Sequence, residues 1–115
     1  MTENEFKEAM AMVHSKDPMT YEDGFHLLIG YVDSFSAQLT QLVKKENDPS
    51  LRAKFIEILG HGTNESIIQV LKSELTSKNR EVRFWAYNQL ECFGNPVANR
   101  IISKYKTENP DEDWY

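Results

Sequence analysis

The sequence contains little that could form a cross-link, a membrane span or a β-sheet. Cys92 is the one cysteine among 115 residues, so no internal disulfide can form, which fits a reducing compartment. No run of about 18 apolar residues occurs, and the N-terminal Met-Thr-Glu-Asn-Glu-Phe-Lys lacks the apolar segment of a secretory signal. No segment alternates polar and apolar residues as a half-buried strand does. We therefore expect a cytoplasmic, helical single domain without membrane contact.

Signatures of catalysis and of cofactor binding are also missing. The chain has no Gly-rich phosphate loop, no nucleophile elbow and no Walker pattern. Three scattered histidines show no metal-ligand spacing, namely His14, His26 and His61. Cys92 follows an apolar helical pattern, so we expect a buried or half-buried structural thiol and not a nucleophile. Asp33, Glu57 and Glu65 are expected on solvated surface. We predict no enzyme, no metal and no cofactor.

Excess negative charge is confined to the C-terminus. The net charge is −5, with 13 basic and 18 acidic residues. Four of the acids and no base lie in the last nine residues, within the tail that ends Asp111-Glu112-Asp113-Trp114-Tyr115. The rest of the chain is close to neutral and shows no basic stripe, so nucleic-acid binding is not expected.

A repeat of fixed length is the strongest positive signal. Asp17-Pro18, Asp48-Pro49 and Asn79 lie 31 residues apart, and each opens a segment with helical periodicity. A period of about 20–50 residues is typical of stacked repeats. We predict a single domain, 1–115, with a leading helix at 1–16, repeats at 17–47, 48–78 and 79–107, and an acidic tail at 108–115.

Apolar spacing and capping residues predict seven helices. The expected starts are a capping box at Thr2 and Glu5, a second box at Thr20 and Asp23, the polar break at Asp33-Ser34, Asp48-Pro49, a point near Asn64, Asn79, and Asn95-Pro96. Gly60 and Gly94 are expected to end two of them. The expected buried stripes include Phe6, Ala9, Met10 and Val13 in the first helix and Val97, Ile101, Ile102 and Tyr105 in the last.

The two later copies resemble HEAT repeats. The resemblance rests on Asp48-Pro49-Ser50-Leu51-Arg52 and Asn79-Arg80-Glu81-Val82-Arg83, each at the start of a first helix. It covers about Asp17 to Lys106 and implies an all-α, right-handed HEAT-like α-solenoid, with one N-terminal helix and three antiparallel helix pairs. In such repeats the position of Arg52 and Arg83 typically bonds to the turn of a neighbouring repeat. The first copy departs from the pattern, with Tyr21 in place of the arginine.

The resemblance implies a protein partner. Among small bacterial proteins of this shape, many resemble immunity proteins, which bind and block a cognate toxin. We therefore predict a stoichiometric complex with one partner, a basic toxin domain. A HEAT-repeat adaptor or assembly module is the alternative. The sequence does not predict the oligomeric state.

Two features are candidates for partner binding. Phe84, Trp85 and Tyr87 cannot all face the stripe of one helix, so Trp85 and Tyr87 are candidate anchors, with packing against a neighbouring helix as the alternative. The tail residues Asp111, Glu112, Asp113, Trp114 and Tyr115 suit docking on a basic surface, with a frayed terminus as the alternative. The polar outward face of the second helices, which includes Gln38, Lys45, Gln69 and Lys72, is a competing surface.

Overall fold

The computed structural model describes residues 1–114, so the predicted contact residue Tyr115 lies outside the described residues. Over that range the chain forms seven α-helices and one short 3₁₀ helix. They are α1 (Glu3–Val13), α2 (Pro18–Ile29), η1 (Val32–Phe35), α3 (Ser36–Lys45), α4 (Pro49–Leu59), α5 (Ser66–Glu74), α6 (Arg80–Phe93) and α7 (Pro96–Glu108). No strand occurs within 1–114, which confirms the predicted all-α class.

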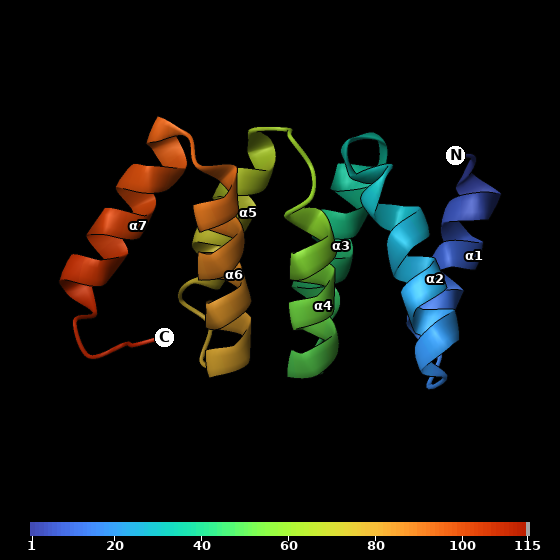
Figure 1. Ribbon diagram of the computed structural model, residues 1–115, viewed down its shortest axis with the longest axis horizontal. Helices are drawn as coiled ribbons and strands as arrows, with labels where there is room; N and C mark the ends of the chain where they lie inside the picture. Colours follow the sequence, from blue (N-terminus) through green and yellow to red (C-terminus); the bar gives the residue numbers. More distant parts are fainter. Residues whose placement is uncertain (115) are drawn as a thin grey trace.

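The helices form two layers along an elongated molecule of 43 × 26 × 23 Å (Figure 1). Helices α2, α4 and α6 pack side by side in the first-helix layer, and α3, α5 and α7 do so in the second-helix layer. Helix α1 packs against α2, and the two layers meet where α3 packs on α4, α5 on α6 and α7 on α6. Helices α1 and α7 lie at opposite ends of the long axis (Figure 1), as stacking of successive units requires.

Side-chain caps set most helix starts where the sequence predicts them. Thr2 and Glu5 form the capping box of α1. Asp48 caps α4, which begins at Pro49, and its side chain accepts a hydrogen bond from the Ser50 amide. Asn79 and Asn95 cap α6 and α7 in the same way. The predicted box at Thr20 and Asp23 is wrong. Asp17 caps α2 by accepting from the Thr20 amide and hydroxyl, so the helix begins at Pro18.

One continuous apolar core fills the space between the layers. The predicted stripe of α1 is buried throughout, Ile67, Ile68 and Leu71 of α5 are no more than 1 % exposed, and so are Phe55, Ile58 and Leu59 of α4. The stripe of α7 differs from the prediction, because Val97 is 38 % exposed and Ala98 is buried in its place. Pro96 starts the helix with Val97 turned to solvent, so a one-residue shift in register moves the apolar line.

The repeat arginines join neighbouring units. Arg52 donates from Nη1 to the Glu46 carbonyl at 3.2 Å, and Arg83 donates from Nη1 to the Ser77 carbonyl at 2.9 Å. Both carbonyls end the preceding repeat, which confirms the role that the HEAT resemblance implies. Arg52 also holds the Glu74 carboxylate of α5 with two bonds of 2.6 and 2.7 Å. The Arg52 guanidinium therefore holds both the turn before α4 and the second helix of the same repeat, α5.

Asp33 is exposed, as the sequence predicts, and it also makes long-range hydrogen bonds that the sequence did not predict. Its carboxylate accepts from the Thr63 amide and hydroxyl, each at 2.7 Å, and from the Asn64 amide at 2.9 Å. These bonds, led by that from the Thr63 hydroxyl, lower the pKa of Asp33. The side chain thus holds η1 against the loop between α4 and α5.

Candidate functional site

The C-terminal tail folds back onto α6. Helix α7 leans away from α6 toward its own C-terminus, and the chain then returns across the opening (Figure 1). We call this region the C-terminal clasp, which consists of the tail residues 109–114 and of Arg80, Arg83, Phe84, Tyr87 and Tyr105.

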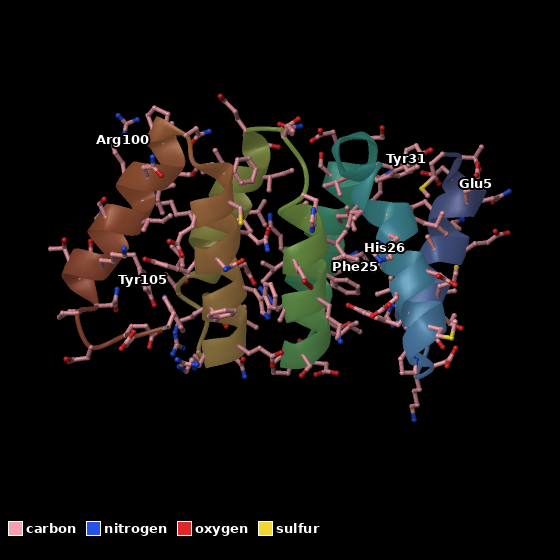
Figure 2. All side chains as sticks on the ribbon, in the orientation of Figure 1. Glu5, Phe25, His26, Tyr31, Arg100 and Tyr105 are labelled. Carbon is pink, nitrogen blue, oxygen red and sulfur yellow. The ribbon has the colours of Figure 1, made fainter. Side chains whose placement is uncertain are left out.

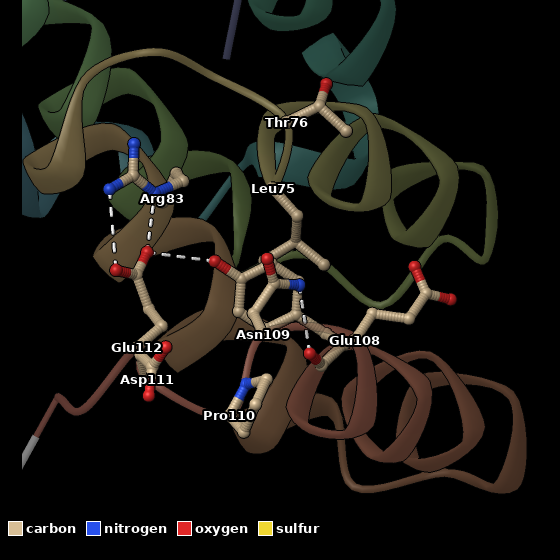
Figure 3. Close-up of a pocket in the computed structure, with 9 residues that line it drawn as sticks. Leu75, Thr76, Arg83, Glu108, Asn109, Pro110, Asp111 and Glu112 are labelled. Carbon is tan, nitrogen blue, oxygen red and sulfur yellow. Dashed lines mark hydrogen bonds and ion pairs between the residues drawn. The ribbon is translucent and has the colours of Figure 1, made fainter.

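Glu112 is the polar centre of the clasp. Arg83 donates from Nε to Glu112 Oε1 at 2.6 Å and from Nη2 to Oε2 at 3.5 Å. The Tyr105 hydroxyl donates to the same Oε1 at 2.9 Å. Figure 3 shows the Glu112 carboxylate facing the Arg83 guanidinium, between α6 and the end of α7. Charged hydrogen bonds of this kind are stronger than neutral ones, so Glu112 fixes the path of the tail.

Trp114 supplies the apolar part of the clasp. Its ring lies 5.8 Å from the Phe84 ring and 5.9 Å from the Tyr87 ring, between centroids. The Arg80 guanidinium lies over it at 5.0 Å and donates to the Asp113 carbonyl at 2.9 Å. The indole Nε1 is buried without a hydrogen-bond partner, so ring packing and the cation–π contact hold this side chain.

The clasp repeats an interaction from inside the solenoid. Arg52 of α4 pairs with Glu74 of α5, and Arg83 is the equivalent residue of α6. A shift of 34 residues aligns Glu74 with Glu108 on α7. Glu108 is exposed and pairs with Lys104 at 3.7 Å. Because α7 leans outward, Glu112 of the tail supplies the carboxylate for Arg83, and the tail closes the C-terminal end of the stack.

Electrostatics make the clasp sensitive to acid. The hydrogen bond from Arg83 is the main cause that lowers the pKa of Glu112 below the ordinary value of 4.5, with Tyr105 adding to it. Burial, followed by the bond to Glu112, raises the pKa of the Tyr105 hydroxyl. A carboxylate with a lowered pKa stabilises the folded state above its unfolded pKa, and this contribution is lost as the pH falls through the folded pKa.

We therefore expect the tail to leave α6 as the pH falls below 4.5. In a Trp85→Phe background the fluorescence of Trp114 reports its environment alone, and it should shift to longer wavelength in an acid transition that precedes global unfolding. Adding Glu112→Gln should abolish this separate transition, because the glutamine side chain is uncharged and does not titrate over this pH range. A transition of equal size and midpoint in both proteins would contradict the role of Glu112.

The structure brings several predicted contact residues together, but largely in contact with the protein itself. Tyr87 is 2 % exposed beneath the tail, and Trp85 is half-buried with its ring edge-on to Phe84 at 5.4 Å. Glu112 and Trp114 are engaged in the clasp. Asp111 and Asp113 are exposed. A direct role of these residues in partner binding stays a prediction, and contact through Tyr87 or Trp114 would require the tail to move.

Charge differs between the two layers, a feature that sequence reasoning missed. The exposed or half-buried acids of the first-helix layer are Glu22, Asp23, Glu57, Glu81 and Glu91. The second-helix layer instead presents exposed Lys44, Lys45, Lys72, Arg100 and Lys104. Of the acids within α3, α5 and α7, Glu74 is paired with Arg52 and Glu108 with Lys104. The first-helix layer also carries Arg52, Lys54, Arg80 and Arg83, so its charge is close to balanced, whereas bases outnumber acids in the second-helix layer.

A groove lies between α5 and α7 within the basic layer. It has a volume of about 270 Å³ and an apolar floor of Leu75, Ile101 and Tyr105, with Lys72, Arg100 and Lys104 around it. A wetter cleft of about 640 Å³ adjoins it and shares Leu75, Thr76, Tyr105 and Glu108. Figure 2 shows Arg100 near the start of α7. It shows Tyr105 further along the same helix, on the side that faces α6.

Other candidate chemistry finds little support among residues 1–114. Cys92 is exposed, so the expectation of a buried or half-buried thiol is wrong, since the apolar line of α6 ends at Leu90 and half-buried Phe93. Within the described range no group of three or more potential ligands could hold a metal ion. Across that range, no helix combines the length and the apolar character needed to span a membrane.

Comparison with known families places the fold. A family model described as HEAT repeats matches residues 36–113, from the start of α3 to within the clasp. Neither the curated proteins nor the solved structures contain a significant match. HEAT repeats generally mediate protein–protein interaction. The match covers more than half of the chain, so this protein belongs to the HEAT-repeat family.

Proposed function

We propose that this protein is a non-enzymatic module that binds one protein partner in stoichiometric amount. The observation that carries the proposal is the basic groove between α5 and α7, built on a HEAT scaffold. Its apolar floor and charged rim resemble the usual arrangement of a protein interface, in which apolar anchors are surrounded by polar groups. On one side of the groove, α5 is held to α4 by the bonds between Arg52 and Glu74.

Within this function, neutralisation of a bacterial toxin by occlusion is the narrower proposal, and an adaptor or assembly role in the cytoplasm is the alternative. The size of the domain and its HEAT fold support the first by analogy only. The two differ in partner number and strength. An immunity protein should have one tight partner, whereas an adaptor should bind several proteins more weakly.

A tagged pull-down from the source organism, quantified by mass spectrometry, tests the proposal. We expect one dominant protein at roughly equal molar amount. Asp111→Asn/Asp113→Asn should retain it, because this variant removes tail charge while Glu112 and Trp114 keep the clasp closed. Loss of the partner with that variant would show that the charged tail residues contact the partner. Absence of any stoichiometric partner, under conditions in which interacting proteins are expressed, would refute the proposed function.

A chain that ends at Thr107 gives a second result from the same experiment. It lacks Glu112 and Trp114, so it leaves Arg83 without its carboxylate and uncovers Tyr87. We expect the shortened chain to have a lower thermal stability. It should still capture the partner at a temperature at which circular dichroism shows it to be folded. Complete loss of capture by a folded shortened chain, with Asp111→Asn/Asp113→Asn unaffected, would assign binding to the clasp itself.

A further inference from the structure

The groove between α5 and α7 combines a positive rim with an apolar floor. Three bases border it, Lys72 from α5 and Arg100 and Lys104 from α7. Lys44 and Lys45, in the last turn of neighbouring α3, extend the positive charge along the layer. Glu108 is the one acid that lines the groove, and its exposed ion pair with Lys104 at 3.7 Å is weak and easily opened.

We infer that this groove binds an acidic segment of a partner protein that carries an aliphatic or aromatic anchor. This inference rests on the proposed function and specifies the chemistry of its partner. Carboxylates of the segment would pair with Lys72, Arg100 and Lys104. The apolar anchor would lie on Leu75 and Ile101, between the two helices. The assignment follows from charge complementarity, because bases outnumber acids in α3, α5 and α7 although the protein as a whole has a net charge of −5.

The floor distinguishes this ligand from a nucleic acid. Proteins bind nucleic-acid phosphates through Lys and Arg side chains and main-chain amides. A phosphate backbone offers no aliphatic group that could fill an apolar groove. Leu75 is 5 % exposed and Ile101 is half-buried, and together with Tyr105 they supply the apolar lining of the groove. The structure therefore favours an acidic peptide for the groove.

Selection from a library of random peptides displayed on phage tests the inference on the full-length protein. Winning peptides are then synthesised with a fluorescent label, and their affinity is measured by polarisation. The groove variant is Lys72→Glu/Arg100→Glu. Its matched control is Lys7→Glu/Lys16→Glu, which changes net charge equally on exposed positions near the other end of the molecule. Circular dichroism establishes that both variants are folded.

We expect winners enriched in Asp and Glu with at least one Leu, Ile, Phe or Trp. Affinity should fall at least about tenfold with the groove variant and change less than about twofold with the control. Replacing the apolar anchor of a winning peptide by alanine should also weaken binding about tenfold. Neutral or basic winners, equal losses in both variants, insensitivity to the anchor, or no winners at all would overturn the inference. So would saturable binding of a short DNA duplex that the groove variant abolishes.

The proposed function is separable from this result. If the pull-down partner binds the groove variant as well as the unaltered protein, the groove inference fails while the protein-binding function stands. If neither protein captures a partner, the proposed function fails. Capture that is lost only with the groove variant supports both. Concentration-dependent dimerisation lost with that variant would instead identify a second copy of this chain as the occupant.

Discussion

Replacing Gly24 by alanine is expected to lower the free energy of unfolding by about 2 kcal/mol. A Cβ at this position of α2 would lie 2.7 Å from the Met12 Cβ, 2.8 Å from the Ala9 carbonyl oxygen and 3.0 Å from the Val13 amide nitrogen. Two of these are backbone atoms, so α1 as a whole must shift. Overpacking of this kind costs about 3 kcal/mol, and the better helix propensity of alanine returns about 1 kcal/mol.

Gly30→Ala is the matched control. Gly30 ends the same helix with a right-handed helical backbone, and no atom lies within 4 Å of its expected Cβ. This substitution should therefore be neutral or slightly stabilising. Urea unfolding followed by circular dichroism measures both. Equal stability of the two variants would mean that α1 does not pack against Gly24 as closely as described.

Replacing Arg52 by methionine should cost about 3 kcal/mol of unfolding free energy. The Glu74 side chain is only 7 % exposed, and Arg52 supplies both of its hydrogen bonds. Removing the guanidinium leaves a carboxylate inside the solenoid without a partner. Breaking a buried pair in this way costs several kcal/mol, whereas replacing both members by apolar residues is often close to neutral.

A double-mutant cycle separates these terms. We expect Arg52→Met/Glu74→Met to lie within about 1 kcal/mol of the unaltered protein, and therefore to recover most of the loss. Arg83→Met is the comparison, with an expected cost of about 1 kcal/mol, because Glu112 lies on a tail that can swing into water. A double variant as unstable as Arg52→Met alone would show that the loss came from packing of the arginine stem and not from the unpaired Glu74.

Local signals predicted the helix starts well, because caps act over three residues. Asp48-Pro49, Asn79 and Asn95-Pro96 each place a side-chain acceptor beside the amides that it satisfies, so the pattern is visible in the sequence. The apolar stripe of α1 was also predicted correctly, because helical periodicity places its apolar residues on one face. The errors at Val97 and Cys92 lie near helix ends, where a small change in register alters which side chain faces the core.

Contacts between distant segments account for what the sequence did not predict. Glu112 meets Arg83 at a separation of 29 residues, and Asp33 meets Thr63 at a separation of 30. In a repeat of about 31 residues such pairs link equivalent levels of adjacent units, but no local pattern marks which acid will be chosen. Only the packed structure likewise shows that α1 needs the space beside Gly24.

The candidate site shows the same division. Sequence drew attention to the acidic aromatic tail, and the structure places Glu112 and Trp114 inside the clasp that closes the solenoid. The basic groove was missed because Lys72, Arg100 and Lys104 are spread over two helices and are balanced by acids elsewhere in the chain. Only the packing of α5 beside α7 brings these three bases together.

Hydrogen exchange of the isolated complex would test most directly that the second-helix layer, and not the tail, carries binding. Exchange is measured by mass spectrometry with and without the captured partner. The account predicts slower exchange in peptides covering α5 and α7, with the first-helix layer unchanged and the clasp no more protected than in the free protein. Protection confined to residues 108–114, with α5 and α7 unchanged, would contradict it.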